Sequence, residues 1–520
     1  MTKNRCIVAL LVAGALSFIP TSARGQTFYG SIVGTVMDTS GAVIPDTGVT
    51  LTNLGTAEKR TMQSDAAGLY QFLNLGVGNY RLDVEKAGFK HFIRGPLSVE
   101  VQNVLRIDIL MEVGAVSQTV EVTAATPMLQ PQTSSLGQVV EERKVQDLPI
   151  NGRNPLSLVA LVPGVVPGGY SQANAATNNF TAWGNFSIGG AQLNQSEVIW
   201  DNMPQSISVL NGVGFVPTED AVAEFKVQTN NFQAEFSHTA GGVINLSTKS
   251  GTNKIHGSVY EFVRNNVFDA NTFFNNAHGV DIAPLRQNQF GVTFGGPVTI
   301  PHVYDGKDKT FVFGSWEGFR QRLGQSFLGS VPSAAEHQGN FSQLRDVNGN
   351  PVPIYDPTTT RPDPANPGHY LRDQVQCQGT LNVMCPGAIS PSGADFAKLW
   401  PLPNTAPAFP GTDVNNWAGN GSVANNADQV NIRVDKAISD KQRFMTRYSF
   451  YRIDTPGLDI WKNKTALFDN AAPQTTKIND AIAEDTYTFS PTTILQARYG
   501  YLRFGFTRAP ASLGQDLTEF

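Results

Sequence analysis

The carboxyl-terminal half of the chain alternates hydrophobic and polar residues along a series of extended runs. In one run, Val430, Ile432 and Val434 are separated by polar residues. Successive side chains of a strand point to opposite faces, so such a run would have one hydrophobic and one polar face. A soluble β-sandwich has the same period, so the alternation alone leaves two fold classes open. We expect seven strands here, at 254–264, 286–298, 309–322, 427–438, 441–453, 478–489 and 493–507.

The connections between these runs distinguish the two classes. Their lengths are 21, 10, 104, 2, 24 and 3 residues, alternately long and short. Outer-membrane barrels have short periplasmic turns and longer external loops. A structureless connection of 104 residues would be unusual in a compact soluble domain. The pattern therefore predicts the first part of an antiparallel transmembrane β-barrel, with residues 323–426 as an external loop.

Composition excludes several other classes of protein. Only 16% of the residues are charged and 31 are Phe, which argues against intrinsic disorder. The net charge of -5 gives no electrostatic basis for binding nucleic acid. Past the amino terminus there is no run of 18 apolar residues, which excludes a helical membrane protein.

Residues 1–25 have the pattern of a secretory signal peptide. Lys3 and Arg5 precede an apolar core, and small residues around Ala23 offer cleavage sites before Gly25. After cleavage, Cys377 and Cys385 remain, eight positions apart in the long loop. In an exported protein such a pair can form a disulfide. Metal binding by two cysteines without a nearby histidine is disfavoured.

Residues 28–113 form a series of short strands with turn signals every 8–12 residues, which predicts a small β-sandwich. We interpret Asp65 as a turn residue, because Gly68 completes the turn. Calcium binding or catalysis by Asp65 is the less favoured alternative. The order of parts resembles the carboxypeptidase regulatory-like domain, a non-catalytic, transthyretin-like fold often classed as carbohydrate-binding-like. The matching residues are 34–36, 41–42, 65–70, 78–80 and 87–89.

Residues 117–250 mix extended and helical patterns. Residues 139–148 and 156–161 have helical spacing, and 148–155 contains the Pro and Gly residues that separate them. Together with 198–204, 221–227 and 241–252, this order resembles the plug domain of a TonB-dependent outer-membrane transporter, and the whole mature chain resembles the Oar-like group. Two departures from that pattern are Asn202, where the family usually has Gly, and Ser237-His238, in place of a common Gly-Arg pair.

The resemblance implies a location, a function and partners. We expect an outer-membrane receptor that takes up a large or scarce substrate, with energy from the TonB-ExbB-ExbD complex. The sequence does not identify the substrate. Its possible classes are glycan, siderophore, peptide and cobalamin. Outer-membrane lipid would surround the barrel. No cofactor is implied.

By the same resemblance, one short segment matches the TonB box, which the inner-membrane protein TonB grips. An extended peptide can add a strand to a partner's sheet through main-chain hydrogen bonds, which suits this role. A plain strand between two domains is the alternative. The segment consists of Thr119, Val120, Glu121, Val122, Thr123 and Ala124.

No catalytic constellation is evident. The seven histidines form no metal-ligand spacing, and neither a nucleophile elbow nor a phosphate-binding loop is present. Residues 346–350 resemble the start of a calcium loop, but Pro357 stands where a Glu ligand is needed, so a simple turn is favoured. We predict no catalytic residue and no metal site.

The barrel predicted here would be incomplete. A plugged barrel of this class has 22 strands, and residues 254–520 would leave 12 residues for each, including loops. Strands alone need about 9–11. We therefore expect a fragment or a truncated product of a longer transporter. Two competing hypotheses are an outer-membrane adhesion or structural protein without transport, and a carbohydrate-processing enzyme suggested only by the regulatory-like domain.

Overall fold

The computed structural model describes residues 29–115, 119–122, 135–168, 183–207, 211–232, 236, 239–271, 273, 276, 282–461, 472–490, 493–510 and 513. The predicted signal peptide lies outside the described residues, as do Thr123, Ala124 and the Ser237-His238 pair. No helix among the described residues is long and apolar enough to cross a membrane.

The amino-terminal part is a two-sheet β-sandwich, called here the N-terminal sandwich. In one sheet β1 (Gly30–Asp38) pairs with β4 (Leu69–Leu75), β7 (Val104–Arg106) and β8 (Ile109–Met111). The other has the order β3-β2-β5-β6-β9, formed by Lys59–Gln63, Gly48–Asn53, Gly78–Glu85, His91–Val99 and Thr119–Val122. Strand β5 shows why the sheets pack, since Tyr80, Leu82 and Val84 alternate into one buried core.

The predicted turn at Asp65 is confirmed, and a second turn of the sandwich, at Asp38, is built in the same way. Asp38 accepts hydrogen bonds from the backbone N–H groups of Ser40 and Ala42. Asp65 accepts from those of Ala67 and Leu69. In each case the side chain closes its own turn, as Asx turns do.

The second part, called here the central domain, covers the described residues from 135 to 250. Its sheet has the order β10-β15-β16-β13-β14, with β13 and β16 parallel. Short helices α2 (Glu142–Asp147), η1 (Asn151–Arg153), η2 (Pro155–Leu161) and η4 (Glu219–Ala221) lie beside it. The hairpin β11 (Val165–Pro167) and β12 (Phe186–Ile188) completes the domain. The sheet strands span Leu136–Val140, Val222–Asn230, Val243–Thr248, Glu197–Trp200 and Met203–Pro204.

The helices expected in this domain were partly wrong. The segment 139–148 begins as the end of β10, because Val139 and Val140 pair with Lys226 and Phe225, and only then turns into α2. β-Branched residues suit a strand that has a neighbour. The segment at 156–161 is a 3-10 helix rather than an α-helix, with Pro155 at its first turn and the side chain of Asn154 as its cap.

The third part is one antiparallel sheet of seven strands, called here the barrel wall. Its order is β17-β18-β21-β26-β27-β28-β29, so every strand pairs with its neighbours along the chain. The seven predicted strands and their alternately long and short connections are confirmed. The strands span His256–Asn265, Leu285–Pro297, Thr310–Gly329, Trp417–Ser439, Gln442–Thr455, Gln474–Ser490 and Thr493–Arg508.

Strands β21 and β26 extend furthest beyond their predicted ranges. Strands β21 and β26 stay in register as far as Gly329 and Trp417, through residues expected to lie in the external loop. The added part of β26 is rich in Gly, Asn and Ser, so its composition is typical of a loop. Backbone pairing with β21 makes it a strand without a hydrophobic pattern.

The two faces of the wall differ as the alternation predicted. Ile432 and Tyr448 are each 46% exposed, and Tyr499 is 72% exposed. Asn431, Arg447 and Ser449, which alternate with them, are buried on the opposite face. Since the polar face is the covered one, the hydrophobic face is left outward, as in a membrane barrel.

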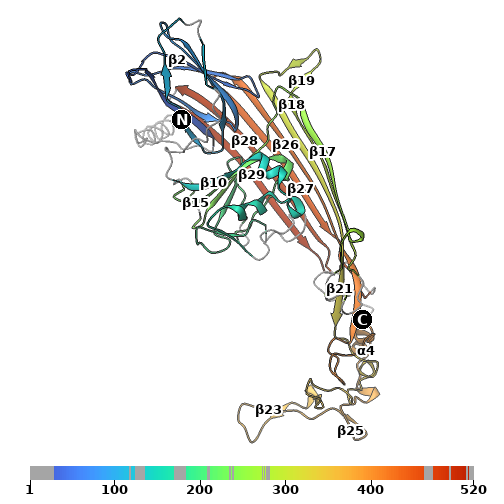
Figure 1. Cartoon of the computed structure of the whole chain (residues 1–520). Coiled ribbons are helices and arrows are strands. Elements are labelled where there is room, and N and C mark those ends of the chain that lie inside the picture. Colours follow the sequence, from blue (N-terminus) through green and yellow to red (C-terminus); the bar gives the residue numbers. More distant parts are fainter. Residues whose placement is uncertain are drawn as a thin grey trace, which may run out of the picture.

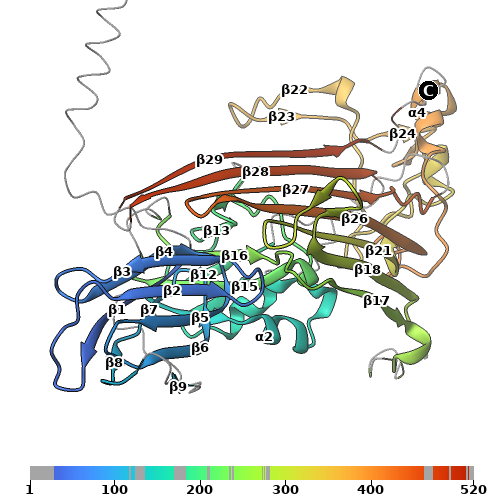
Figure 2. The same ribbon diagram turned by 90° about the horizontal axis from the view of Figure 1, so that it is seen from above.

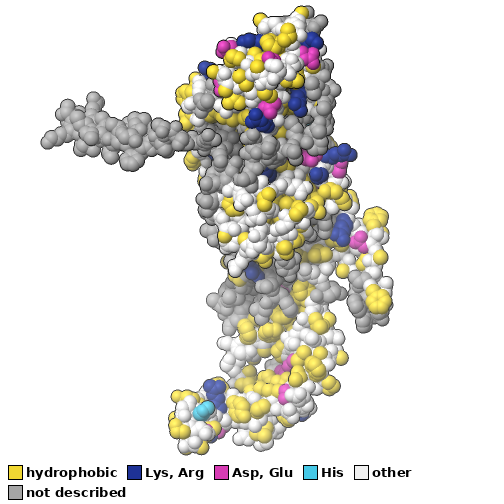
Figure 3. Space-filling model, turned by 60° about the vertical axis from the view of Figure 1, so that its left-hand side comes forward, with side chains coloured by type: hydrophobic (Ala, Val, Ile, Leu, Met, Phe, Trp, Pro, Cys, Tyr) yellow, Lys and Arg dark blue, Asp and Glu magenta, His cyan; other side chains and the backbone are white. Residues whose placement is uncertain are grey.

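The central domain packs on that covered face of the wall, and the N-terminal sandwich lies at one end (Figure 1). Seen from above, the strands of the wall form a curved layer with the central domain on one side (Figure 2). One hydrophobic core joins the two, and includes Trp183 and Phe215 of the central domain with Tyr451 of the wall. In Figure 3 many of the visible charged side chains lie on the sandwich end.

Residues 330–416, between β21 and β26, lie at the far end of the wall from the sandwich (Figure 1). They contain two small hairpins, β22–β23 (Arg361–Pro362 with Tyr370–Leu371) and β24–β25 (Gln376–Cys377 with Thr380–Leu381). Helix α4 (Pro391–Ala397) follows. Asp346 closes a simple turn by accepting from the N–H groups of Asn348 and Asn350.

Candidate functional site

The first feature of the site is the tight turn between β13 and β14. Asp201 and Asn202 both have left-handed backbones, with φ of 45° and 68°. Asp and Asn tolerate this region better than other residues with a Cβ, which explains why Asn202 can stand where Gly is usual. The turn places the Asp201 carboxylate in the interior. There it accepts hydrogen bonds from the Thr248 N–H at 2.9 Å and from the Thr248 hydroxyl at 2.5 Å.

Two arginines of the barrel wall reach this carboxylate. Arg447 Nε lies 3.1 Å from Asp201 Oδ2, and Arg433 Nη1 lies 3.4 Å from Asp201 Oδ1. Arg447 also pairs with Asp480 at 2.7 Å. Gln205 of the central domain donates to the other oxygen of Asp480 at 2.8 Å. We call Asp201, Arg433, Arg447 and Asp480 the charge anchor.

The charge anchor is buried as well as charged. Asp201, Arg447 and Asp480 are almost fully buried. The Arg447 guanidinium lies 3.3 Å from the centre of the Trp200 ring, a cation–π contact. Buried charges are tolerated only when paired and hydrogen-bonded. The anchor therefore joins the central domain to the wall through paired, buried charges.

A second ionic contact joins the central domain to strands β17 and β21 of the wall. Arg153 pairs with Asp220, and its Nη2 lies 3.4 Å from Glu219. Its Nε is 3.7 Å from Glu317 of the wall. The guanidinium also lies 4.6 Å from the centre of the Tyr260 ring, so an aromatic side chain of β17 covers it.

Hydrogen bonds within the wall hold the Glu317 side chain of this second contact in place. The Tyr260 hydroxyl and the Gln289 amide each donate to Glu317 at 2.9 Å. Within the central domain, burial raises the pKa of Glu219 to about 7, and the nearby Arg153 opposes that rise. Three carboxylates, those of Glu219, Asp220 and Glu317, surround the single Arg153 guanidinium. Burial favours a proton on Glu219 and so reduces this excess of negative charge.

The N-terminal sandwich docks on the central domain through the turn at 100–103. Glu224 of β15 accepts from the Val101 N–H. Lys226 donates to the Gln102 carbonyl at 3.0 Å, and Asn245 donates to the Gln102 side chain at 2.9 Å. Burial raises the pKa of Glu224 to about 8, an effect that the Val101 N–H partly offsets.

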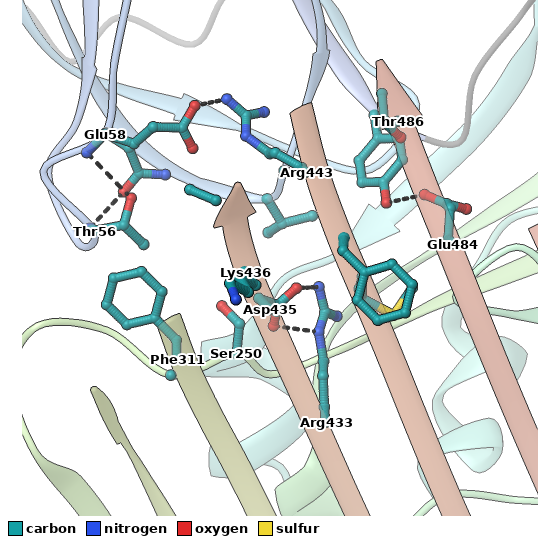
Figure 4. A pocket seen from close by; sticks show the side chains of 18 of the residues that line it. Thr56, Glu58, Ser250, Phe311, Arg433, Asp435, Lys436, Arg443, Glu484 and Thr486 are labelled. Atoms are coloured by element: carbon teal, nitrogen blue, oxygen red, sulfur yellow. Dashed lines mark hydrogen bonds and ion pairs between the residues drawn. The ribbon is translucent and has the colours of Figure 1, made fainter. Parts of the chain in front are cut away.

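The sandwich also contacts the barrel wall. Tyr29 donates its hydroxyl proton to Glu484, and Arg443 pairs with Glu58. A cavity of about 160 Å³ lies where sandwich, central domain and wall meet. Figure 4 shows Glu58 and Arg443 pointing toward one another across it, with Arg433 turned toward Asp435.

The predicted TonB-box segment lies on the sandwich. Residues 119–122 form β9, which pairs in parallel with β6, from His91 opposite Thr119 to Arg94 opposite Val122. The Val120 side chain packs against the sandwich core. Thr119 is exposed.

The predicted cysteine pair is bonded in the structure. Cys377 and Cys385 are joined with a Cα–Cα separation of 5.0 Å and lie in the 330–416 insertion. They are distant in sequence from the charge anchor and from β9. Among the described residues, no group of three or more His, Cys, Asp or Glu side chains is arranged to hold a metal ion.

The charge anchor itself was missed by sequence reasoning. The alternation in β26 and β27 did place Arg433 and Arg447 on the inner face. Their partner Asp201 was visible only as a residue of an extended motif. A contact between residues more than 200 positions apart has no local signal.

Comparison with known proteins agrees with this architecture. A family model described as an outer membrane beta barrel domain matches residues 247–520. Another, described as a carboxypeptidase regulatory-like domain, matches residues 31–112. Over 321 residues the chain is 26% identical to the TonB-dependent transporter Oar of Myxococcus xanthus, covering 59% of this chain and 27% of that protein.

Two solved structures have related features. The outer membrane transporter YddB of Escherichia coli matches with 10% identity and a TM-score of 0.40, over 70% of this chain and 38% of that one. The ferric-catecholate import receptor Fiu of E. coli K12 matches with 12% identity and a TM-score of 0.33, over 74% and 52%. The chain thus spans only part of the length of each of these proteins.

The chain belongs to the outer membrane β-barrel domain family. It is an Oar-like homologue of TonB-dependent transporters, and its location is the outer membrane. The predicted fold class is confirmed: the protein is mainly β, with an N-terminal sandwich and an antiparallel barrel-type sheet.

Proposed function

We propose that this chain is the plug-bearing part of a receptor for energised uptake across the outer membrane. The central domain is the plug, and residues 119–124 are the TonB box. TonB, energised by ExbB and ExbD through the inner-membrane proton gradient, pulls this segment and rearranges the plug. The 330–416 insertion lies outside the cell and contributes to substrate capture.

The observation that carries this proposal is the order of elements from β9 to the charge anchor. Among the described residues, the element that follows β9 along the chain is β10, the edge strand of the central sheet. The far edge of that sheet carries the Asp201 turn, which is bound to Arg433 and Arg447. Beyond β9 itself, a pull on residues 119–124 acts first on this edge strand of the central sheet, which is held on one side only.

The substrate is a large or scarce molecule that the proposal leaves unnamed among glycan, siderophore, peptide and cobalamin. Similarity of fold does not choose among these classes. The carbohydrate-binding-like character of the N-terminal sandwich supports glycan only by resemblance. A test of the proposal should therefore not depend on the substrate.

The purified periplasmic domain of TonB provides such a test. We expect it to bind the full chain in detergent, and we expect deletion of residues 119–124 to weaken binding at least tenfold. The matched control removes six residues, 363–368, from the insertion and should bind like wild type. Equal binding by all three proteins would contradict the TonB-box assignment. If the chain is an adhesion protein without transport, none of the three proteins should bind TonB.

A further inference from the structure

The segment proposed as the TonB box is already a strand of another sheet. Strand β9 extends the sheet β3-β2-β5-β6 by one strand, in parallel register with β6 over four residue pairs. Its backbone is thus engaged in the kind of pairing by which a partner would grip it. Strand β9 and the edge of β6 that it covers therefore belong to the same chain.

The Val120 side chain holds this strand in place as well. Val120 packs against the core that contains Phe92, its partner residue on β6. Removing β9 from the sandwich would expose that edge of the core and the pairing groups of β6. An exposed strand edge with apolar neighbours is unfavourable in water, so the paired state is favoured.

The sandwich cannot simply follow β9 when the segment is pulled. It is held to the central domain through Glu224, Lys226 and Asn245. It is held to the wall through the Tyr29–Glu484 and Glu58–Arg443 contacts. A force on β9 is therefore applied against a fixed partner strand.

We propose that the N-terminal sandwich masks the TonB box, and that TonB engages residues 119–122 by displacing them from the edge of β6. This inference rests on the proposed function. The sandwich thereby sets a threshold for coupling to TonB. Only chains in which β9 is released can bind, so the observed affinity for TonB falls in proportion to the fraction of released chains. A tenfold reduction corresponds to about 1.4 kcal/mol in favour of the masked state.

A cysteine pair across the two strands tests this inference in the full chain. His91 and Thr119 are direct partners in the register, so H91C/T119C should form a disulfide that locks β9 to β6. We expect the oxidised protein to bind the periplasmic domain of TonB at least tenfold more weakly than the reduced protein. The readout is the dissociation constant in each redox state.

Three kinds of control show whether a change in TonB affinity comes from the disulfide between β9 and β6. Wild type reports any effect of reducing Cys377–Cys385. The single variants H91C and T119C report the effect of each substitution. The pair T50C/T61C joins β2 to β3, on the same sandwich but away from β9. None of these should show a redox-dependent change in TonB affinity.

The possible results are distinguishable. If the locked protein binds as tightly as the reduced one, TonB adds to the outer edge of β9 without displacing it, and the inference is overturned. Failure of the two cysteines to cross-link would also overturn it, because β9 would then not lie on β6. If wild type itself does not bind TonB, the proposed function fails, and this inference fails with it.

Discussion

At the scale of single residues, the charge anchor is the contact on which the position of the central domain depends most. Asp201 lies between two arginines of the wall, and Arg447 is shared between Asp201 and Asp480. Breaking a buried ion pair by removing one partner leaves an uncompensated charge, which is much costlier than losing an exposed pair.

We expect Asp201→Asn to loosen the central domain. The substitution keeps the size of the side chain but leaves Arg433 and Arg447 with less compensating charge. The expected loss is about 3–5 kcal/mol of unfolding free energy, as for other buried pairs. Denaturant titration in detergent, followed by Trp fluorescence, would measure it because Trp200 lies against Arg447.

Asp454→Asn is the matched control for this variant. Asp454 pairs with Arg452 on the same wall, but both side chains are substantially exposed. Its loss should cost at most about 1 kcal/mol. Similar shifts for Asp201→Asn and Asp454→Asn would show that the anchor does not hold the central domain.

Part of this site could be predicted from the sequence and part could not. The two-residue period was sufficient to place Arg447 and Ser449 on the inner face of β27, because strand geometry is local. Asp201 lay in the segment 198–204, which stood out only by its resemblance to the plug pattern, and its partners depend on how the central domain sits against the wall. That placement depends on residues far apart in sequence, which meet in the charge anchor and in the shared hydrophobic core.

At the scale of elements, we expect the docking of the 100–103 turn on β15 to depend on pH. Burial raises the pKa of Glu224 to about 8, well above the ordinary value of 4.5. The docked state therefore retains a proton that the undocked state releases between these two values. Docking is strongest below pH 4.5 and weakens as the pH rises through 8.

We expect Glu224→Gln to remove this dependence, since a neutral amide needs no proton to stay buried. Wild type should undock from the central domain more readily at pH 9 than at pH 6, whereas the variant should dock equally at both. A spin-label pair at Ser40 and Tyr499 would report the distance between sandwich and wall. Glu112→Gln, at an exposed carboxylate of the sandwich, serves as control.

If wild type showed the same distance distribution at both pH values, Glu224 would not control docking. The same conclusion would follow if Glu112→Gln and Glu224→Gln behaved alike. Either result would favour the Gln102 contacts with Lys226 and Asn245 as the bonds that control docking.

Elements also show where sequence patterns fail. Residues 139–148 have helical spacing, but pairing with β15 makes the first of them a strand. Residues 417–426 have the composition of a loop, but pairing with β21 makes them part of β26. In both cases a neighbouring strand supplies backbone hydrogen bonds that local composition does not reveal.

At the scale of the whole molecule, the sandwich lies at one end of the wall and the central domain lies on its covered face. The sandwich holds β9 and touches both other parts, and the central domain is bound to different strands of the wall by two sets of ionic contacts. The long insertion lies at the opposite end (Figure 1). This arrangement separates the end on which a partner would pull from the end that would meet a substrate.

The most direct test of the central claim is photo-crosslinking from position 119 in living cells. Thr119 is exposed on β9, so a photoreactive residue there should leave the sandwich intact. We expect a cross-linked product that contains TonB, and we expect its yield to fall when the inner-membrane proton gradient is collapsed. If the protein reaches the outer membrane but no position from 119 to 124 yields a TonB product, residues 119–124 do not couple this protein to TonB, and the proposed function is wrong.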